Sequence, residues 1–208
     1  AAATATAATA SAASAAAAAA AAPSLGPAGT LRVVLANRTS PTGRGRRRLA
    51  NLEELVARCD GWRAPPPHAG IRLSCRPHNF GVGLVRSLGV LQASDVMVTS
   101  HGADMINAFA LHRGASVLEV MPVYQAGCPC KMYKELLSSE GGGAPAVLHY
   151  QMSSKNKSMA VIRPDERKKQ GTYHMNLILP WPTLQQALLH VLTVAGRVEN
   201  YQYRTFEY

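Results

Sequence analysis

The sequence contains no apolar run long enough to cross a lipid bilayer, which takes about 20 consecutive residues. It also lacks the basic start and Leu-rich core of a signal peptide, since residues 1–22 are almost entirely Ala, Thr and Ser. Such a segment has neither charge nor an apolar face, and it is expected to be a linker. We therefore expect the chain to be part of a longer protein, with an amino-terminal membrane anchor and a first domain outside it.

Sequence patterns typical of two enzyme classes are also absent. No Gly-x-Ser-x-Gly occurs, which disfavours a Ser/His/Asp hydrolase. The pair Gly81 and Gly83 approaches the dinucleotide-binding fingerprint, but Arg86 stands at the position of its third glycine. A Pro-His-Asn-Phe loop further separates this pair from the preceding strand pattern, so a nicotinamide-binding domain is a minor alternative.

Acidic residues are scarce beside basic ones, with 12 Asp and Glu against 22 Lys and Arg and a formal net charge of +10. This excess is compatible with nucleotides, nucleic acids or acidic polymers and does not choose among them. The densest basic cluster comprises Arg44 and Arg46–Arg48, which is either a solvated loop or a localisation or nucleic-acid patch. The interleaved aromatics of a single-strand binder are absent there, so no nucleic-acid partner is expected.

Cysteines are few, four in all. Cys128 and Cys130 are separated by one proline, a poor spacing for a structural zinc site. Cys59 and Cys75 flank a Pro-rich loop and can form a disulfide in an oxidising compartment. Buried free thiols fit equally well, because connectivity cannot be deduced from sequence.

Apolar runs alternate with helical patterns along most of the chain, which predicts an α/β fold with a Rossmann-like parallel sheet and helices on both faces. We expect a linker at 1–29, one domain at 30–198, a polar, basic loop at 153–173 and a tail at 199–208. The expected strands are 31–35, 71–75, 96–99, 117–120 and 146–151, and the expected helices are 49–59, 82–91, 105–110, 132–139 and 182–198.

Residues 94–122 form the most informative stretch, with a strand, a tight turn, a helix and a second strand. The turn, Ser100–Ala103, directly follows the apolar run Val96–Thr99 and opens into the helix. Free backbone N–H groups at such a turn favour an anion, usually a phosphate. Gly102 has no Cβ, which lets a ligand approach the backbone closely.

This stretch resembles the signature of glycosyltransferase family 61, which joins an apolar strand, His-Gly-Ala, a helix with an Asn, and a strand ending in Glu and Pro. An upstream block is also similar, and together the two span residues 31–122. One departure is Asp104, where the family often has glycine; its carboxylate would repel a diphosphate, so we expect it to point away. The residues that match are His101, Gly102, Ala103, Asn107, Glu119 and Pro122, with Arg38, Arg47, Arg48, Asn51 and Glu53 upstream.

The resemblance implies a two-domain GT-B glycosyltransferase that inverts the sugar, with this chain resembling its carboxyl-terminal, donor-binding half. The donor would be a nucleotide sugar, UDP-linked in this interpretation, and the acceptor a glycan or glycoprotein hydroxyl. The general base would lie in the missing amino-terminal domain. No Asp-x-Asp pair occurs, so no metal cofactor is expected. The implied location is the Golgi or ER lumen, as part of a type II membrane protein.

Candidate site residues follow from the same stretches. Arg38, at the end of the first strand, can fork two donors onto phosphate oxygens, unless it is only a loop arginine. Glu119 is expected to accept from ribose hydroxyls, by analogy with dinucleotide folds, or else to pair with an arginine. His101 either touches the diphosphate or sugar, as a weak catalytic candidate, or holds the turn. The donor-binding set is Arg38, Ser100, His101, Gly102, Ala103 and Glu119, with Arg48, Asn51 and Asn107 as support. A non-catalytic domain that binds weakly remains the main alternative.

Overall fold

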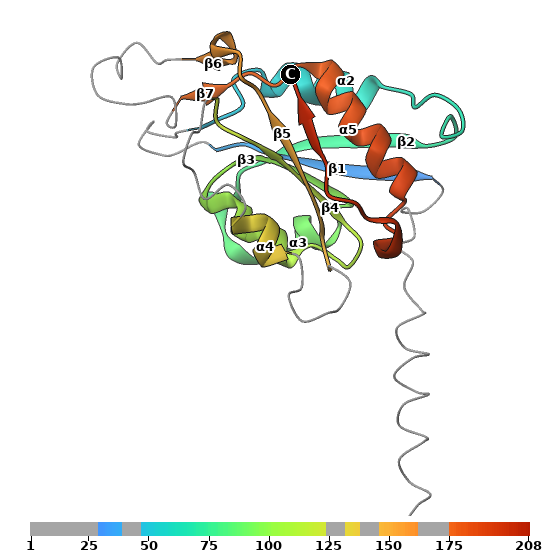
Figure 1. The fold of residues 1–208 in the computed structure, drawn as a ribbon. Helices are drawn as coiled ribbons and strands as arrows, with labels where there is room; N and C mark the ends of the chain where they lie inside the picture. The colour runs from blue at the N-terminus through green and yellow to red at the C-terminus, as the bar shows by residue number, and fades with distance from the viewer. Residues whose placement is uncertain (1–28, 39–46, 124–131, 138–145, 162–174) are drawn as a thin grey trace, which may run out of the picture.

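The computed structural model describes residues 29–38, 47–123, 132–137, 146–161 and 175–208 (Figure 1). Residues 1–28 of the linker expected at 1–29 lie outside the described residues, as do the Cys128 and Cys130 pair, Arg44 and Arg46.

A six-stranded sheet forms the centre of the fold, and all of its neighbouring strands are parallel. The strand order is β2-β1-β3-β4-β5-β8. The α/β class and the parallel sheet are therefore confirmed, and each expected strand is present within a few residues. The strands are β1 (Thr30–Ala36), β2 (Arg72–His78), β3 (Val96–Ser100), β4 (Ser116–Val120), β5 (Leu148–Ser153) and β8 (Thr205–Glu207).

Helices cover both faces of this sheet (Figure 1). One face carries α2 (Leu52–Gly61) and α5 (Trp181–Val194), and the other carries α3 (Leu84–Gln92), the 3-10 helix η2 (Ala103–Ala110) and α4 (Met132–Leu137). Short 3-10 turns complete the set: η1 (Phe80–Val82), η3 (Lys157–Met159) and η6 (Val198–Asn200). Among the described residues, no helix combines the length and the apolarity that a membrane crossing requires.

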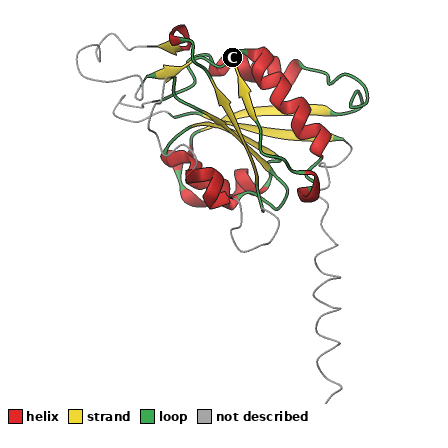
Figure 2. Cartoon of the chain, in the orientation of Figure 1, coloured by secondary structure: helices red, strands yellow, loops and turns green. Residues whose placement is uncertain are grey.

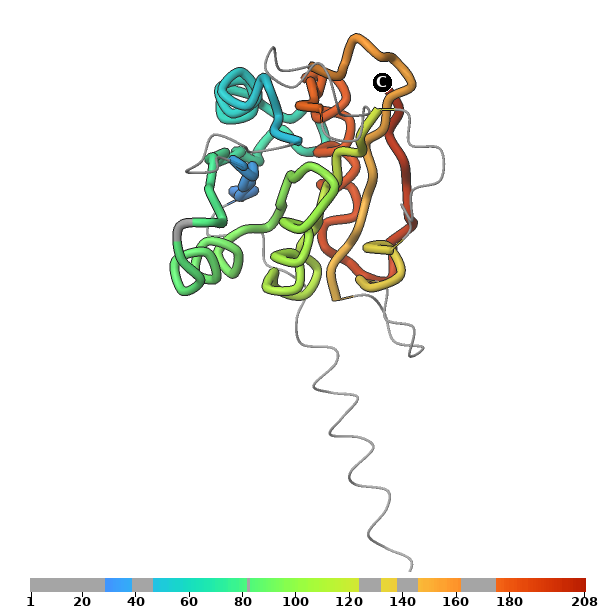
Figure 3. Tube along the Cα trace, turned by 90° about the vertical axis from the view of Figure 1, so that its left-hand side faces the viewer, coloured from blue at the N-terminus to red at the C-terminus, as the bar shows by residue number. Residues whose placement is uncertain are grey.

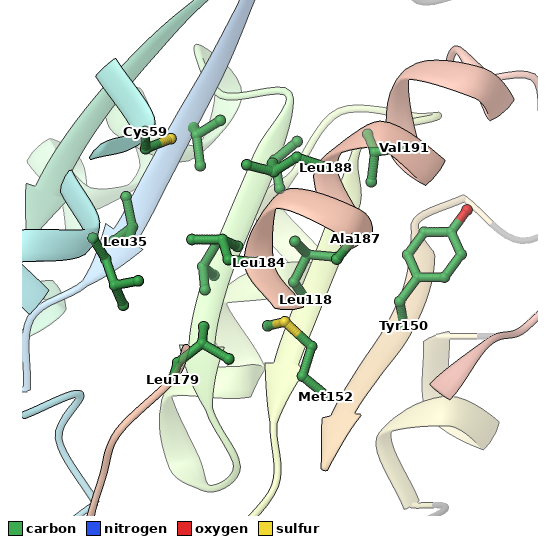
Figure 4. Packing of buried hydrophobic residues seen from close by; sticks show 14 of the residues in the cluster. Leu35, Cys59, Leu118, Tyr150, Met152, Leu179, Leu184, Ala187, Leu188 and Val191 are labelled. Atoms are coloured by element: carbon green, nitrogen blue, oxygen red, sulfur yellow. The ribbon is translucent and has the colours of Figure 1, made fainter. Parts of the chain in front are cut away.

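The core follows from side-chain alternation along the strands, since successive residues point to opposite faces. Leu118 of β4 and Met152 of β5 pack with α5, whose Leu184 and Leu188 point toward the sheet (Figure 4). Val117 faces the other way, into the cluster formed with α3, η2 and α4. The central strands are buried on both faces, as expected of a parallel sheet.

Two expectations need correction. The segment 199–208 is not a free tail, because β8 pairs with β5 and extends the sheet (Figure 3). The loop expected at 153–173 contains a short strand, β6 (Ala160–Val161), which pairs antiparallel with β7 (Asn176–Leu177) outside the main sheet (Figure 2). Both strands are short and lack strong apolar alternation, so tertiary pairing defines them.

A disulfide joins Cys59 of α2 to Cys75 of β2, with 5.9 Å between their Cα atoms. This resolves the alternative left open by the sequence in favour of the bridge. It fastens α2 to the edge strand of the sheet.

Candidate functional site

The carboxyl ends of β1 and β3 lie side by side at the point where the order in which the chain adds strands to the sheet reverses. The chain runs outward from β1 to β2 and then returns to place β3 on the other side of β1. The segment after β1 leads to α2 on one face, whereas β3 leads directly to η2 on the opposite face. Ligands of open α/β sheets bind at such switch points.

Arg38, just beyond β1, reaches across to the turn that follows β3. Its Nε lies 2.8 Å from Oδ2 of Asp104, and its Nη1 donates to Oγ of Ser100 at 3.4 Å. These two contacts flank Gly102 in the sequence. The structure therefore brings Arg38 and the Ser100–Ala103 turn together, as expected. Asp104 does not point away from the site, because the guanidinium of Arg38 attracts its carboxylate.

The backbone amides of Gly102 and Ala103 lie in this turn. Among the described residues, the N–H groups of Gly102 and Ala103 donate to no backbone carbonyl. The carbonyl of Gly102 accepts from the hydroxyl of Tyr133 in α4 at 2.9 Å, which fixes the peptide's orientation. Gly102 has φ = +137°, a conformation that disfavours any side chain. The turn is thus held in a fixed conformation, with Gly102 buried and Ala103 exposed.

Behind the turn lies a buried polar cluster centred on Glu119 of β4, whose side chain has no exposed surface. His101 Nδ1 lies 2.6 Å from Oε1, while His149 Nε2 and Gln151 Nε2 lie 2.8 and 3.1 Å from Oε2. Glu119, His149 and Gln151 share one face of the sheet because they alternate along β4 and β5. His149 and Gln151 of β5, together with His101 just after β3, therefore converge on the carboxylate of Glu119.

Burial alone would raise the pKa of Glu119, but hydrogen bonds from His101, His149 and Gln151 outweigh it and lower the pKa to about 2. The carboxylate is therefore ionised at neutral pH and accepts from all three partners. His101 must then carry its proton on Nδ1 and His149 on Nε2. In this way Glu119 sets both the tautomer and the orientation of the His101 ring.

This geometry corrects the ribose role expected for Glu119. A carboxylate with no exposed surface cannot reach a ribose without rearrangement of the cluster, and its partners are histidines rather than an arginine. His101 is itself buried, with its ring edge-on to that of Tyr133. The side chains of His101 and Glu119 therefore pack beneath the Ser100–Ala103 turn, on its buried side, and stabilise its conformation.

The three expected support residues have other roles in the described structure. Asn51 clasps the backbone of Leu179, donating to its carbonyl at 2.9 Å and accepting from its N–H at 3.2 Å. Asn107 donates to the carbonyl of Asp104 at 2.9 Å, inside η2. Arg48 uses its backbone to bond with Asn176 and Leu177. Asn51 and Asn107 are thus occupied in shaping the fold.

A cleft of about 880 Å³ opens next to this site, at the start of α2 and the carboxyl ends of β1 and β2. Asn37, the neighbour of Arg38, lines it together with Arg48. Its other polar lining includes amides and carboxylates: Asn51, Glu53, Glu54 and Asn176. Such groups match the hydroxyls and amides of a neutral polar ligand.

Sequence reasoning missed several residues that the structure places at the turn. Tyr133 and His149 come from segments with no recognisable motif, and the expected strand 146–151 by itself gave no reason to select His149. Arg47 matches the upstream block of the resemblance but was not among the candidate site residues, yet its side chain lies against Gly102. No group of three or more potential metal ligands occurs within the described ranges.

Comparison with known proteins adds no further assignment: neither the family models nor the curated proteins that were searched match this chain.

Proposed function

We propose that this chain is the donor-binding half of an inverting glycosyltransferase resembling family 61, and that the switch point binds the diphosphate of a nucleotide sugar. The supporting observation is the meeting of Arg38 with the Ser100–Ala103 turn at the carboxyl ends of β1 and β3. A guanidinium fork and two backbone amides suit a phosphate chemically. The family assignment itself rests on the sequence resemblance.

In this proposal the protein's main chemical contribution is to stabilise the departing nucleoside diphosphate. As the acceptor hydroxyl attacks C1 of the sugar, the bond from C1 to the diphosphate oxygen breaks and negative charge accumulates on that oxygen. Arg38 and the amides of Gly102 and Ala103 are preorganised to receive this charge. His101 and Glu119 act indirectly, because they hold the turn that presents the amides. No metal is part of the proposal.

The cleft beside Asn37 offers room for the uncharged part of the donor. Its amide and carboxylate lining suits hydroxyl groups, and its position next to Arg38 lets one ligand occupy both places. The acceptor, a glycan or glycoprotein hydroxyl, and the general base belong to a further domain in this proposal. The Cys59–Cys75 disulfide supports an oxidising compartment such as the Golgi or ER lumen.

Calorimetry with UDP, uridine and NAD tests the proposal on the chain as it stands. We expect UDP to bind more tightly than uridine, because only UDP carries the diphosphate, and more tightly than NAD. We also expect no sugar transfer by the chain alone, since loss of acceptor orientation removes about 7–11 kcal/mol of barrier lowering. Tighter binding of NAD, or equal binding of UDP and uridine, would contradict donor binding at this site. Sugar transfer by residues 23–208 alone would contradict the half-enzyme interpretation.

A further inference from the structure

A tripeptide in the turn after β5 takes no part in the proposed site. Asn156, Lys157 and Ser158 form Asn-x-Ser with x other than proline, which is the acceptor pattern for N-linked oligosaccharides. The same pattern occurs once more in the sequence, at Asn37-Arg38-Thr39. The pattern has meaning only at a surface position of a chain that enters the secretory pathway, so the structure decides its value at each place.

The side chains of Asn156 and Ser158 are exposed and contact each other. Oδ1 of Asn156 accepts from the N–H of Ser158 at 3.0 Å and from its hydroxyl at 2.9 Å, which closes a local turn. In the part of the chain that the structure describes, Nδ2 of Asn156 makes no hydrogen bond. The hydroxyl on Oδ1 draws electron density from the amide, which eases loss of a proton from Nδ2.

The fold uses the backbone of Asn156 and leaves its side chain to this turn. The N–H of Asn156 donates to Oγ of Ser154 at 3.1 Å, and its carbonyl accepts from the N–H of Met159 at 3.1 Å. The carbonyl of Met159 accepts from the N–H of Ile178 at 2.8 Å, which fastens the turn to the segment after β7. The turn lies at the periphery of the molecule, beside β6 (Figure 1). A large group on Nδ2 would therefore extend into solvent without disturbing the core.

Asn37 has a different environment. It directly follows β1, is half-buried, and donates its N–H to the carbonyl of His78 at 2.7 Å. It also lines the cleft of about 880 Å³ beside Arg38. An oligosaccharide on Asn37 would fill the cleft that the proposed donor needs. Of the two asparagines, Asn156 is therefore the one that the folded chain can present with a glycan.

The disulfide between Cys59 and Cys75 is an independent observation on the compartment. Such bonds form and persist in oxidising environments, which include the ER lumen. The Asn-x-Ser pattern acts as an acceptor in proteins that pass through the same secretory route. The disulfide thus supports the condition that the acceptor pattern requires.

We propose that Asn156 is an N-glycosylation site of this chain and that Asn37 is not. A lumenal transferase would supply the oligosaccharide as a lipid-linked diphosphate. A bond forms between Nδ2 of Asn156 and C1 of the first sugar, while the bond from C1 to the diphosphate oxygen breaks. The lipid diphosphate leaves with the bonding electrons, and one proton of Nδ2 passes to a base of that transferase. The chain is the substrate in this step, so the inference does not depend on its own proposed activity.

Expression of the full chain behind a cleavable secretion signal in cultured eukaryotic cells tests the site. The wild-type chain should run more slowly on a denaturing gel than after treatment with an amidase that removes N-linked oligosaccharides. Asn156→Gln and Ser158→Ala should both abolish this shift, whereas Ser158→Thr should retain it, because either hydroxyl residue completes the pattern. Asn37→Gln should also retain the shift. Asn200→Gln, which changes an exposed asparagine without the pattern, is the matched control and should retain it as well.

Peptide mass spectrometry locates the sugar, because the amidase converts the asparagine that carried it to aspartate. Conversion is expected at Asn156 and not at Asn37. The inference is wrong if the wild-type chain shows no shift, if Asn156→Gln retains the full shift, or if Asn37 is the residue converted. Ser158→Ala leaves Asn156 itself unchanged, so a shift that survives in this variant also contradicts the site.

The outcome is separable from that of the proposed donor binding. Glycosylation at Asn156 together with equal binding of UDP and uridine would leave the modification site standing and remove the nucleotide sugar. Tighter binding of UDP than of uridine by a chain that stays unmodified at Asn156 would do the reverse.

Discussion

The two ends of the β1–β3 pair carry the same residue types in different arrangements. At the amino end, Arg32 and Asp95 form a two-point pair, with Nε to Oδ2 at 3.0 Å and Nη2 to Oδ1 at 2.8 Å. Asp95 also accepts from the Arg32 backbone N–H at 2.7 Å and lies 3.3 Å from His112 Nε2. At the carboxyl end, Nε of Arg38 lies 2.8 Å from Oδ2 of Asp104, whose side chain is more exposed than that of Asp95.

This difference separates structural pairing from binding. The amino-end carboxylate is saturated by donors from its own chain, which leaves little for a ligand to gain. At the carboxyl end, Asp104 is partly exposed, so an anion can compete with its carboxylate for the guanidinium of Arg38. The same arginine and aspartate chemistry therefore stabilises one end of the sheet and prepares the other for a ligand.

The largest effect on stability is expected at the amino end. Asp95→Ala should lower the free energy of unfolding by about 3–4 kcal/mol, because it leaves Arg32 and its backbone N–H without the buried carboxylate. Urea denaturation measures this loss, with Glu207→Ala as an exposed control. A loss below about 1 kcal/mol would place the pair with ordinary surface ion pairs and remove the contrast between the two ends.

Glu119 is a third carboxylate, which accepts hydrogen bonds from His101, His149 and Gln151. Its contribution to stability should appear as a pH dependence of the free energy of unfolding. Its pKa is lowered from 4.5 to about 2 in the folded chain, so its stabilisation is present above pH 4.5 and is lost as the pH falls toward 2. The full loss should amount to about 3 kcal/mol, of which about 2 kcal/mol falls between pH 6 and pH 3. Urea titrations at pH 6 and pH 3 should show a smaller decrease in Glu119→Gln than in the wild type. Equal decreases would show that Glu119 is not held in its ionised form.

The effect on ligand binding should appear only at the carboxyl end. Arg38→Ala should weaken UDP binding by about 2 kcal/mol, because a charge-assisted contact to phosphate is lost. Arg32→Ala is the mirror variant: it should lower stability and leave the affinity of the folded chain unchanged. Calorimetry on both variants checks this, and equal losses of UDP affinity would mean that only overall basicity matters.

The smallest expected effect is that of Asp104 on stability. Its carboxylate is partly exposed and makes a single contact with Arg38, so Asp104→Ala should change the free energy of unfolding by less than about 1 kcal/mol. Thermal denaturation of the Asp104→Ala and Asp95→Ala variants, measured together, compares the two losses of stability directly. A loss as large as that of Asp95→Ala would make Asp104 a structural residue and remove the contrast between the two ends.

Much of the fold was predictable because its signals are local. The apolar runs of β1, β3 and β4 are buried on both faces and stand out in the sequence, and the helices between them show clear periodicity. The carboxyl-terminal strand β8 was missed, since three residues with one buried side chain give no periodic signal. Its identity as a strand depends on pairing with β5.

The position of the candidate site was predictable, but the contacts between its side chains were not. The strand-turn-helix pattern identified Ser100–Ala103, and the order of elements placed Arg38 at the same edge. The partners of Glu119 could not be deduced, because His101, Glu119 and His149 are brought together only when β3, β4 and β5 pair in register. The contact between Arg47 and Gly102 could not be deduced for a similar reason, because it forms only when the segment before α2 packs against the turn after β3.

The sequence by itself determined the parallel α/β sheet and the turn at the end of β3, because short-range periodicity and turn chemistry specify them. Tertiary structure decided which charges meet. It paired Asp95 with Arg32 at one end of two strands, set Asp104 and Arg47 around Arg38 at the other, and buried Glu119 among histidines. Electrostatic interactions depend on distance and burial, and both are properties of the folded chain rather than of the order of its residues.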